Sequence, residues 1–274
     1  MSFARDVVEA VDPGALALVE LAHDGARREW TFGEIARRSA CMAAALDGGG
    51  VRRGEVVLTL IGNRPEWVVT MVACFRAGYV ALPCTEQLRA KDLRLRLEVT
   101  RPSAIVCDER NRAELEAAAP SCPVLLVPDE ALFAPGMEDG APPHVDAGPA
   151  DPCLITFTSG TAGEAKAVVH GQRYLDGQAA QAEHWLGARP GDVVWCTAAS
   201  GWSKSARTSS APREPCTTPS PRYPRKNVGS LSGSRHSSPS SIHSFTPGSG
   251  GPIDPGFGSR PAGCAVVCPV SVWP

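Results

Sequence analysis

The sequence lacks several features that would place it in a broad class at once. Its 274 residues carry a formal net charge of −2, so no excess of one sign directs the chain toward nucleic acid or acidic membranes. No run approaches the ~20 apolar residues that a membrane-spanning helix needs, so we expect no membrane span. Residues 1–6 lack a basic region followed by an apolar core, which is why we also expect no secretory signal.

Cysteine pairs with metal-binding or redox spacing are missing as well. The ten cysteines include no C-x-x-C pair, and Cys264 and Cys268 have no companion cluster of His or Cys. Several others lie inside apolar segments, where a reduced cysteine behaves as a small hydrophobe: Cys41, Cys74, Cys107, Cys153 and Cys196. We therefore expect a reduced, cytoplasmic protein without a metal site.

What the sequence does contain is a regular alternation of β-like and helical segments. Strands are predicted at residues 15–22, 55–61, 79–82, 104–107, 124–127, 154–157, 167–169 and 193–198. Helices are predicted at residues 31–48, 65–78, 91–99, 110–119 and 172–186. Strands and helices at this spacing predict βαβ crossovers, a parallel twisted sheet and an α/β fold. Residues 128–150, rich in Pro, Gly and Asp, are predicted as a surface loop.

Local signals set some of these boundaries. Thr31 and Glu34 have the spacing of a capping box, which starts the first helix. Asn63 can cap the second helix, and Pro65 suits its first turn. Pro83 is predicted to end the strand at residues 79–82.

The stretch that carries chemistry runs from Ile155 to Val168, I-T-F-T-S-G-T-A-G-E-A-K-A-V. Gly160 and Gly163 allow the backbone to turn its N–H groups toward an anion. Hydroxyl donors and one mobile cation surround them: Thr158, Ser159, Thr161 and Lys166. The glycine spacing differs from that of a Walker A loop, and no Ser or Thr follows the lysine. The pattern predicts a phosphate-binding loop of another kind, with an ordinary hairpin turn as the alternative.

This string resembles the phosphate loop of the adenylate-forming superfamily, T-S-G-T-T/S-G-x-P-K-G. Two positions depart from that pattern, since Ala165 replaces its proline and Ala167 its glycine. The order of the other segments also resembles the superfamily, from the T-F-x-E helix at residue 31 onward. The resemblance covers residues 30–207. Within the superfamily, the segment around Trp202, G-W-S-K-S-A, looks most like medium-chain acyl-CoA synthetases.

The resemblance implies the N-terminal portion of the superfamily's large domain and a two-step ligation. A small-molecule carboxylate, either a medium-chain acyl or an aromatic acid, would be activated by ATP with Mg²⁺ and passed to coenzyme A. Thr158, Ser159, Gly160, Thr161 and Gly163 would hold the β- and γ-phosphates, and Lys166 would supply charge. Trp202 would line the acyl pocket, for which plain packing is the alternative.

Other parts of such an enzyme are missing from these 274 residues. There is no Y-G-x-T-E string, whose glutamate helps to hold magnesium in the superfamily. We therefore expect the chain, a truncated form of the enzyme, to be inactive as given. Two alternatives stay open, namely a non-catalytic module that binds ATP or pyrophosphate, and an enzyme that loads a carrier protein.

The composition changes after residue 207. Ser, Pro, Gly and Arg dominate residues 208–274, and Leu231 is the only leucine there. Such a stretch cannot bury enough apolar surface to offset its ordering entropy, so we expect a disordered tail. Its few aromatics lie far apart, so no stacking platform for nucleic acid is predicted. We interpret the tail as an out-of-frame translation product, with a genuine linker as the alternative.

Overall fold

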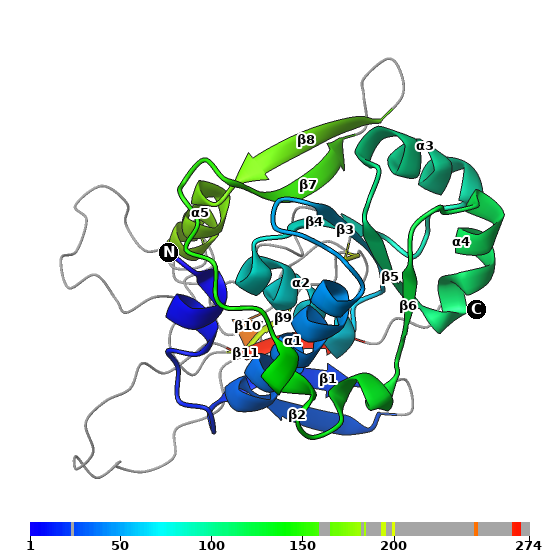
Figure 1. The fold of residues 1–274 in the computed structure, drawn as a ribbon. Coiled ribbons are helices and arrows are strands. Elements are labelled where there is room, and N and C mark those ends of the chain that lie inside the picture. Colours follow the sequence, from blue (N-terminus) through cyan, green and yellow to red (C-terminus); the bar gives the residue numbers. More distant parts are fainter. Residues whose placement is uncertain are drawn as a thin grey trace, which may run out of the picture.

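A computed structural model describes residues 1–22, 25–158, 165–181, 184, 193–195, 199–200, 244–245 and 265–269. The predicted α/β architecture is confirmed. Its centre is a six-stranded sheet in the order β6-β5-β3-β4-β7-β8 (Figure 1). The strands are β3 (Val56–Leu60), β4 (Val80–Cys84), β5 (Ala104–Asp108), β6 (Val124–Val127), β7 (Pro152–Thr158) and β8 (Lys166–Gly171). All neighbours are parallel except β7 and β8, which form an antiparallel hairpin.

Helices cover both faces of this sheet. On one face lie α1 (Phe32–Gly48) and α2 (Pro65–Ala77), whose apolar side chains share a core with Val57 of β3. On the other face, α3 (Ala90–Thr100) and α4 (Arg112–Ala118) pack around Leu58. Because successive residues of a strand point to opposite faces, β3 contributes side chains to both cores. Helix α5 (Arg173–Gln181) follows β8.

A second, five-stranded sheet lies beside α1, in the order β10-β9-β11-β1-β2 (Figure 1). It contains β1 (Leu16–Leu21), β2 (Arg27–Thr31), β9 (Val193–Trp195), β10 (Ser244–Phe245) and β11 (Ala265–Pro269). The strand predicted at residues 193–198 was expected to continue the parallel sheet, and this was wrong. The sequence analysis also missed β2 and the two short strands β10 and β11 within the tail; the remainder of residues 208–274 lies outside the described part.

The capping box at the start of α1 is confirmed. The amide of Glu34 donates to Thr31 Oγ1 at 3.1 Å, and the amide of Thr31 donates to Glu34 Oε2 at 2.7 Å. Pro65 occupies the first turn of α2 as predicted, but Asn63 is not its cap. Arg64 is the N-cap residue, and its side chain makes no capping hydrogen bond. At the other end of α2, Gly78 adopts a left-handed conformation with φ of 71°.

Two other boundaries differ from the prediction. Strand β4 continues through Pro83, which pairs with Thr59 of β3. Strand β4 pairs with β7 at Ala81 and Leu154. Pro83 lies beyond that pair, so its missing N–H interrupts no hydrogen bond between these two strands. The helix predicted at residues 110–119 is divided into a short 3₁₀ turn, η2 (Glu109–Asn111), and α4.

The segment at residues 128–150 is more structured than a plain surface loop. It contains two 3₁₀ turns, η3 (Glu130–Phe133) and η4 (Met137–Gly140), which pack against α1. Phe133 is buried, and the guanidinium of Arg38 lies 4.5 Å from the centre of its ring. Arg38 also binds Glu130 at 2.8 Å, so η3 is held by a charged and an apolar contact together.

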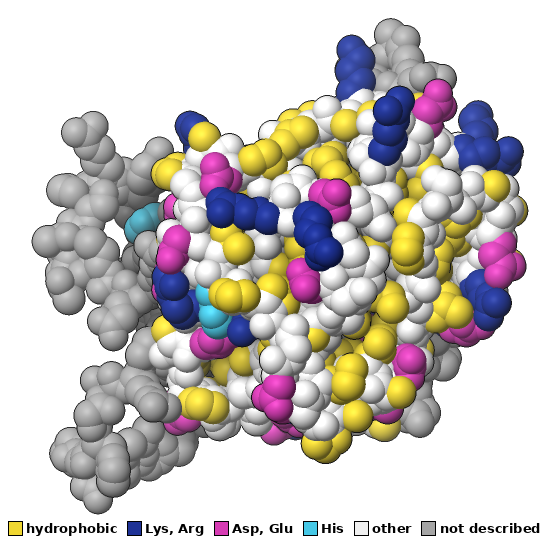
Figure 2. Space-filling model, in the orientation of Figure 1, with side chains coloured by type: hydrophobic (Ala, Val, Ile, Leu, Met, Phe, Trp, Pro, Cys, Tyr) yellow, Lys and Arg dark blue, Asp and Glu magenta, His cyan; other side chains and the backbone are white. Residues whose placement is uncertain are grey.

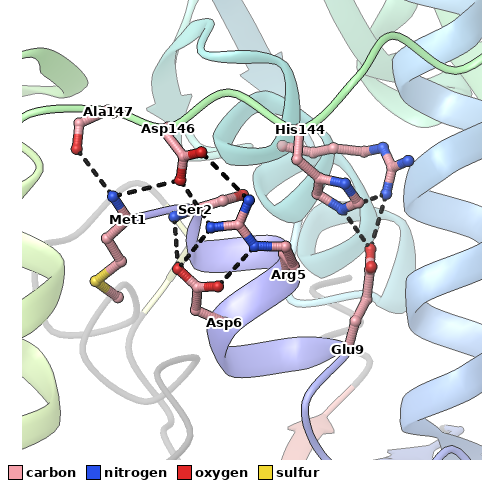
Figure 3. A network of polar contacts seen from close by, with 9 residues as sticks. Met1, Ser2, Arg5, Asp6, Glu9, His144, Asp146 and Ala147 are labelled. Carbon is pink, nitrogen blue, oxygen red and sulfur yellow. Dashed lines mark hydrogen bonds and ion pairs between the residues drawn. The ribbon is translucent and has the colours of Figure 1, made fainter.

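The N-terminal turn, η1 (Ala4–Val8), is tied to the stretch that leads into β7 (Figure 3). Arg5 Nη2 lies 2.7 Å from Asp146 Oδ1, and the terminal ammonium of Met1 donates to the carbonyl of Ala147 at 3.3 Å. A second cluster joins Glu9 to His144 at 2.8 Å. These contacts hold residues 144–147, which lead into β7, the strand that precedes the candidate site.

Candidate functional site

The hairpin of β7 and β8 carries the predicted phosphate loop. Thr158, the last residue of β7, pairs with Lys166, the first residue of β8. Both side chains are exposed, and the hydroxyl of Thr158 makes a long hydrogen bond of 3.5 Å to the carbonyl of Lys166. The structure therefore places Thr158 and Lys166 opposite each other at the base of the loop.

The loop leaves the sheet at the edge where ligands bind in parallel α/β proteins. Strand β7 is parallel to β4, and β4 to β3, so the carboxyl ends of all three face the same way. In open α/β sheets, ligand sites lie outside the carboxyl ends of the strands. The position of Thr158 and Lys166 fits that rule, which is a general argument independent of the motif.

Most of the predicted loop residues cannot be placed. Residues 159–164 lie outside the described part of the chain, and with them Ser159, Gly160, Thr161 and Gly163. The predicted pocket residue Trp202 lies outside it too. Their roles toward phosphate and the acyl group stay predictions.

Side chains beneath the loop were not part of the predicted set. On the α5 side of the hairpin, Thr156 Oγ1 lies 2.9 Å from His170 Nε2, and the His170 ring lies 4.4 Å from the Tyr174 ring. Burial lowers the pKa of His170, which favours the neutral imidazole. This arrangement is typical of a packed, hydrogen-bonded histidine, and it holds β7 and β8 together.

On the opposite face of the hairpin, Arg96 of α3 lies over Phe157, with its guanidinium carbon 4.7 Å from the ring centre. The sequence reasoning missed this residue, because a single arginine on a helix carries no signal of what it will cover. Figure 2 shows Lys and Arg side chains gathered over α3 and beside the tip of the hairpin. The basic residues of α3 and its N-cap are Arg89, Lys91, Arg94 and Arg96.

A charged cluster occupies the same carboxyl edge three strands away from β7, at the end of β5. The fully buried carboxylate of Asp108, at the end of β5, accepts from Arg64 at 3.0 Å and from Arg110 at 2.8 Å. Burial alone would raise the pKa of Asp108, but hydrogen bonds from the Arg110 side chain and backbone, helped by the charge of Arg64, outweigh it and hold the pKa below 3.8. This cluster fixes the loops after β3 and β5.

A pocket of about 310 Å³ lies at the other edge, beside the amino ends of β3, β4 and β7. Its lining includes Gly54, Gly78 and Pro152, and the pair Arg53–Asp151, 3.2 Å apart, borders it. This pocket does not adjoin the base of the phosphate loop. Within the described residues, no group of three or more His, Cys, Asp or Glu side chains could hold a metal ion.

Comparison with known proteins identifies the class. The model of the AMP-binding enzyme family matches residues 6–208, and the chain belongs to this family. It is 34% identical over 197 residues to acyl-coenzyme A synthetase ACSM5, mitochondrial, of Mus musculus, an alignment that covers 67% of this chain and 34% of that protein. The chain thus spans about a third of the length of this relative.

Solved structures show the same fold. Acetoacetyl-CoA synthetase from Streptomyces lividans superposes with a TM-score of 0.67 at 22% identity, covering 76% of this chain and 36% of that one. ATP-bound MatB from Rhodopseudomonas palustris gives a TM-score of 0.59 at 24% identity, covering 70% and 39%. The resemblance to adenylate-forming enzymes is confirmed. Among the helices that the structure describes, none is long and apolar enough to cross a membrane.

Proposed function

We propose that the chain carries the nucleotide-phosphate loop of an AMP-forming acyl-CoA synthetase. The observation that carries the proposal is the exposed pair of Thr158 and Lys166 at the base of a Gly/Ser/Thr-rich loop on the carboxyl edge of the sheet. Membership of the AMP-binding family and the name of the ACSM5 relative support the same reaction class.

In the proposed reaction a carboxylate oxygen attacks the α-phosphorus of ATP. The bond from that phosphorus to the bridging oxygen breaks, and its electron pair leaves with pyrophosphate. The thiol of coenzyme A then attacks the acyl carbonyl carbon, loses its proton and displaces AMP. The substrate would be a medium-chain or aromatic carboxylic acid, with Trp202 at its pocket.

This chain's contribution is electrostatic. Pyrophosphate gains negative charge as it departs, and donors arranged in advance around that charge lower the barrier. Backbone N–H groups at Gly160 and Gly163, with the hydroxyl of Thr158, would hold the phosphates, while Lys166 would offset the charge. Magnesium would accompany ATP and neutralise part of the phosphate charge; we assign none of the described residues to it.

The alternatives differ in what the chain does after binding. We propose that residues 1–274 bind pyrophosphate but form no acyl-adenylate, because the elements that place the α-phosphate in line are not among them. Carboxylate-dependent exchange of labelled pyrophosphate into ATP tests this, and clear exchange by this chain would overturn it.

We keep a cytoplasmic, reducing location as part of the proposal. The free cysteines of the described region fit it, whereas the name of the ACSM5 relative places that protein in mitochondria.

Calorimetric titration of the chain with pyrophosphate tests the loop itself. We expect Lys166→Ala to weaken binding about tenfold, the lower end for one charge-assisted contact at an exposed site. Arg52→Ala is the matched control, since it removes one exposed cation 3.5 Å from Asp47, in the turn before β3 at the far edge of the sheet. Equal affinities of wild type and Lys166→Ala would remove the lysine from the site, and a wild type that ignores pyrophosphate would refute the proposal.

A further inference from the structure

Arg96 of α3 contacts the end of β7, the strand from which the phosphate loop departs. Its guanidinium lies over the ring of Phe157, the residue before Thr158, at 4.7 Å from the ring centre. Both side chains are half-buried, and Phe157 packs at the margin of the core between the sheet and α3. A planar cation over an aromatic face is a favourable pairing that a shift of either group would disrupt.

The guanidinium is held from its own helix as well. Arg96 Nη1 donates to the carbonyl of Asp92 at 2.9 Å. Its positive charge also acts on Cys84, the last residue of β4: burial raises the pKa of that thiol to about 12, and Arg96 opposes the rise. One side chain therefore joins α3 to the end of β7.

Within the described residues, β7 is the last strand but one of its sheet. It pairs with β4 through Leu154, which lies opposite Ala81 and four residues before Thr158. On its other side lies β8, which is the last strand of the sheet as described and exposes Val168 and Val169. Beyond Leu154, the end of β7 is held by the burial of Ile155 in the core beside α3, by its hairpin partner and by the contact of Arg96 with Phe157.

We propose that Arg96 is a positioning residue for the phosphate loop, an inference that rests on the function proposed above. Stacking on Phe157 fixes the direction in which Thr158 leaves the sheet, and so the position of Thr158 and of its cross-strand partner Lys166 at the base of the loop. Its role is geometric, so the planar guanidinium matters in addition to the charge. Lysine at this position keeps the charge but loses the flat, pre-organised face.

Hydrogen exchange of the full chain, read at residues 155–158 and 166–169, tests the anchoring without any ligand. We expect Arg96→Met to speed exchange there roughly two- to fivefold, the equivalent of one partly exposed cation–π contact. Arg94→Met is the matched control, because Arg94 is exposed on the same helix and bonds within it, to the carbonyl of Ala90. Phe157→Leu should produce the same change as Arg96→Met, and the double variant should add little to either.

Pyrophosphate titration of the same variants tests the link to the loop. We expect Arg96→Met to weaken binding by a similar factor, with a fall of at most about 4 °C in melting temperature. Arg96→Lys should recover only part of the binding, and Arg94→Met should bind as wild type does. Unchanged exchange in Arg96→Met would overturn the inference however tightly wild type binds pyrophosphate. Faster exchange with unchanged affinity would overturn it too, since the contact would then hold the strand without positioning the loop. A wild type that binds no pyrophosphate overturns the proposed function instead, with the exchange result still reporting on the contact.

Discussion

Replacing Asp108 by alanine removes the carboxylate on which the arginines of the carboxyl edge converge. Arg64 and Arg110 both bind this group, and the backbone amide of Arg110 donates to it at 3.0 Å. After the substitution, Arg64, whose side chain is 19% exposed, keeps Glu66 at 3.4 Å. Arg110, 44% exposed, keeps Glu86 at 3.4 Å and can turn toward water.

These exposures set the size of the loss. Breaking a fully buried ion pair by removing one partner costs about 3–5 kcal/mol, because a charge is left unpaired. Here one of the two cations is nearly half exposed and both keep a second carboxylate, so we expect a loss of about 2–3 kcal/mol in the free energy of unfolding. Asp108→Asn keeps an acceptor in place, and we expect about half that loss.

The effect should depend on pH with a definite sign. The pKa of Asp108 in the folded protein lies below its ordinary value of 3.8. A depressed carboxyl pKa contributes stability that is fully present above the unfolded-state value and is lost as pH falls through the folded-state value. The difference between wild type and Asp108→Ala should therefore be constant near neutrality and shrink below about pH 4.

Urea denaturation at pH 7 and in acid measures both expectations. Glu109→Ala is the control: this neighbouring carboxylate is 57% exposed and lies 3.5 Å from Arg112. We expect no measurable change in its denaturation midpoint. If Asp108→Ala were as stable as Glu109→Ala at pH 7, the ion pairs would contribute nothing to the fold, and the reasoning above would fail.

The remaining predictions concern the backbone and the tail. Gly78→Ala should lower the free energy of unfolding, measured by urea denaturation, by about 1–2 kcal/mol. Gly78 has a φ of 71°, and an added Cβ would lie 3.1 Å from Val145 Cγ1. Gly48→Ala, where the added Cβ meets nothing within 4 Å, should be neutral or stabilising; equal losses at both positions would contradict the argument. Limited proteolysis should remove residues 208–274 and leave a resistant core ending near Arg207. Protection of residues 265–269, which pair with β1, would count against a disordered tail.

The sequence predicted best where one short-range interaction decides the structure. The capping box of Thr31 and Glu34 needs only neighbouring residues, and it is present. The order of strands and helices followed from apolar periodicity, as did the parallel sheet, since short βαβ connections leave few other topologies.

The predictions from sequence failed where a residue far away in the chain determines the local structure. Pro83 ends a strand only if its missing N–H faces a neighbour, and that depends on how far β7 pairs with β4. The strand at Val193–Trp195 pairs with β11 and β10 in the sheet of β1, which no local pattern indicates. Arg96 and Phe157 lie 61 residues apart in the chain, so only the fold reveals their contact.

The antiparallel pairing of β7 and β8 closes the loop independently of the rest of the sheet. Because Thr158 and Lys166 are paired, the two ends of the seven intervening residues are held side by side whatever lies between them. A change of loop length then costs little more than loop-closure entropy, about 0.6 kcal/mol for each doubling. In a parallel strand pair, by contrast, the connection is a crossover whose helix belongs to the core. The loop that we propose binds phosphate can therefore change in sequence and length while the core keeps its stability.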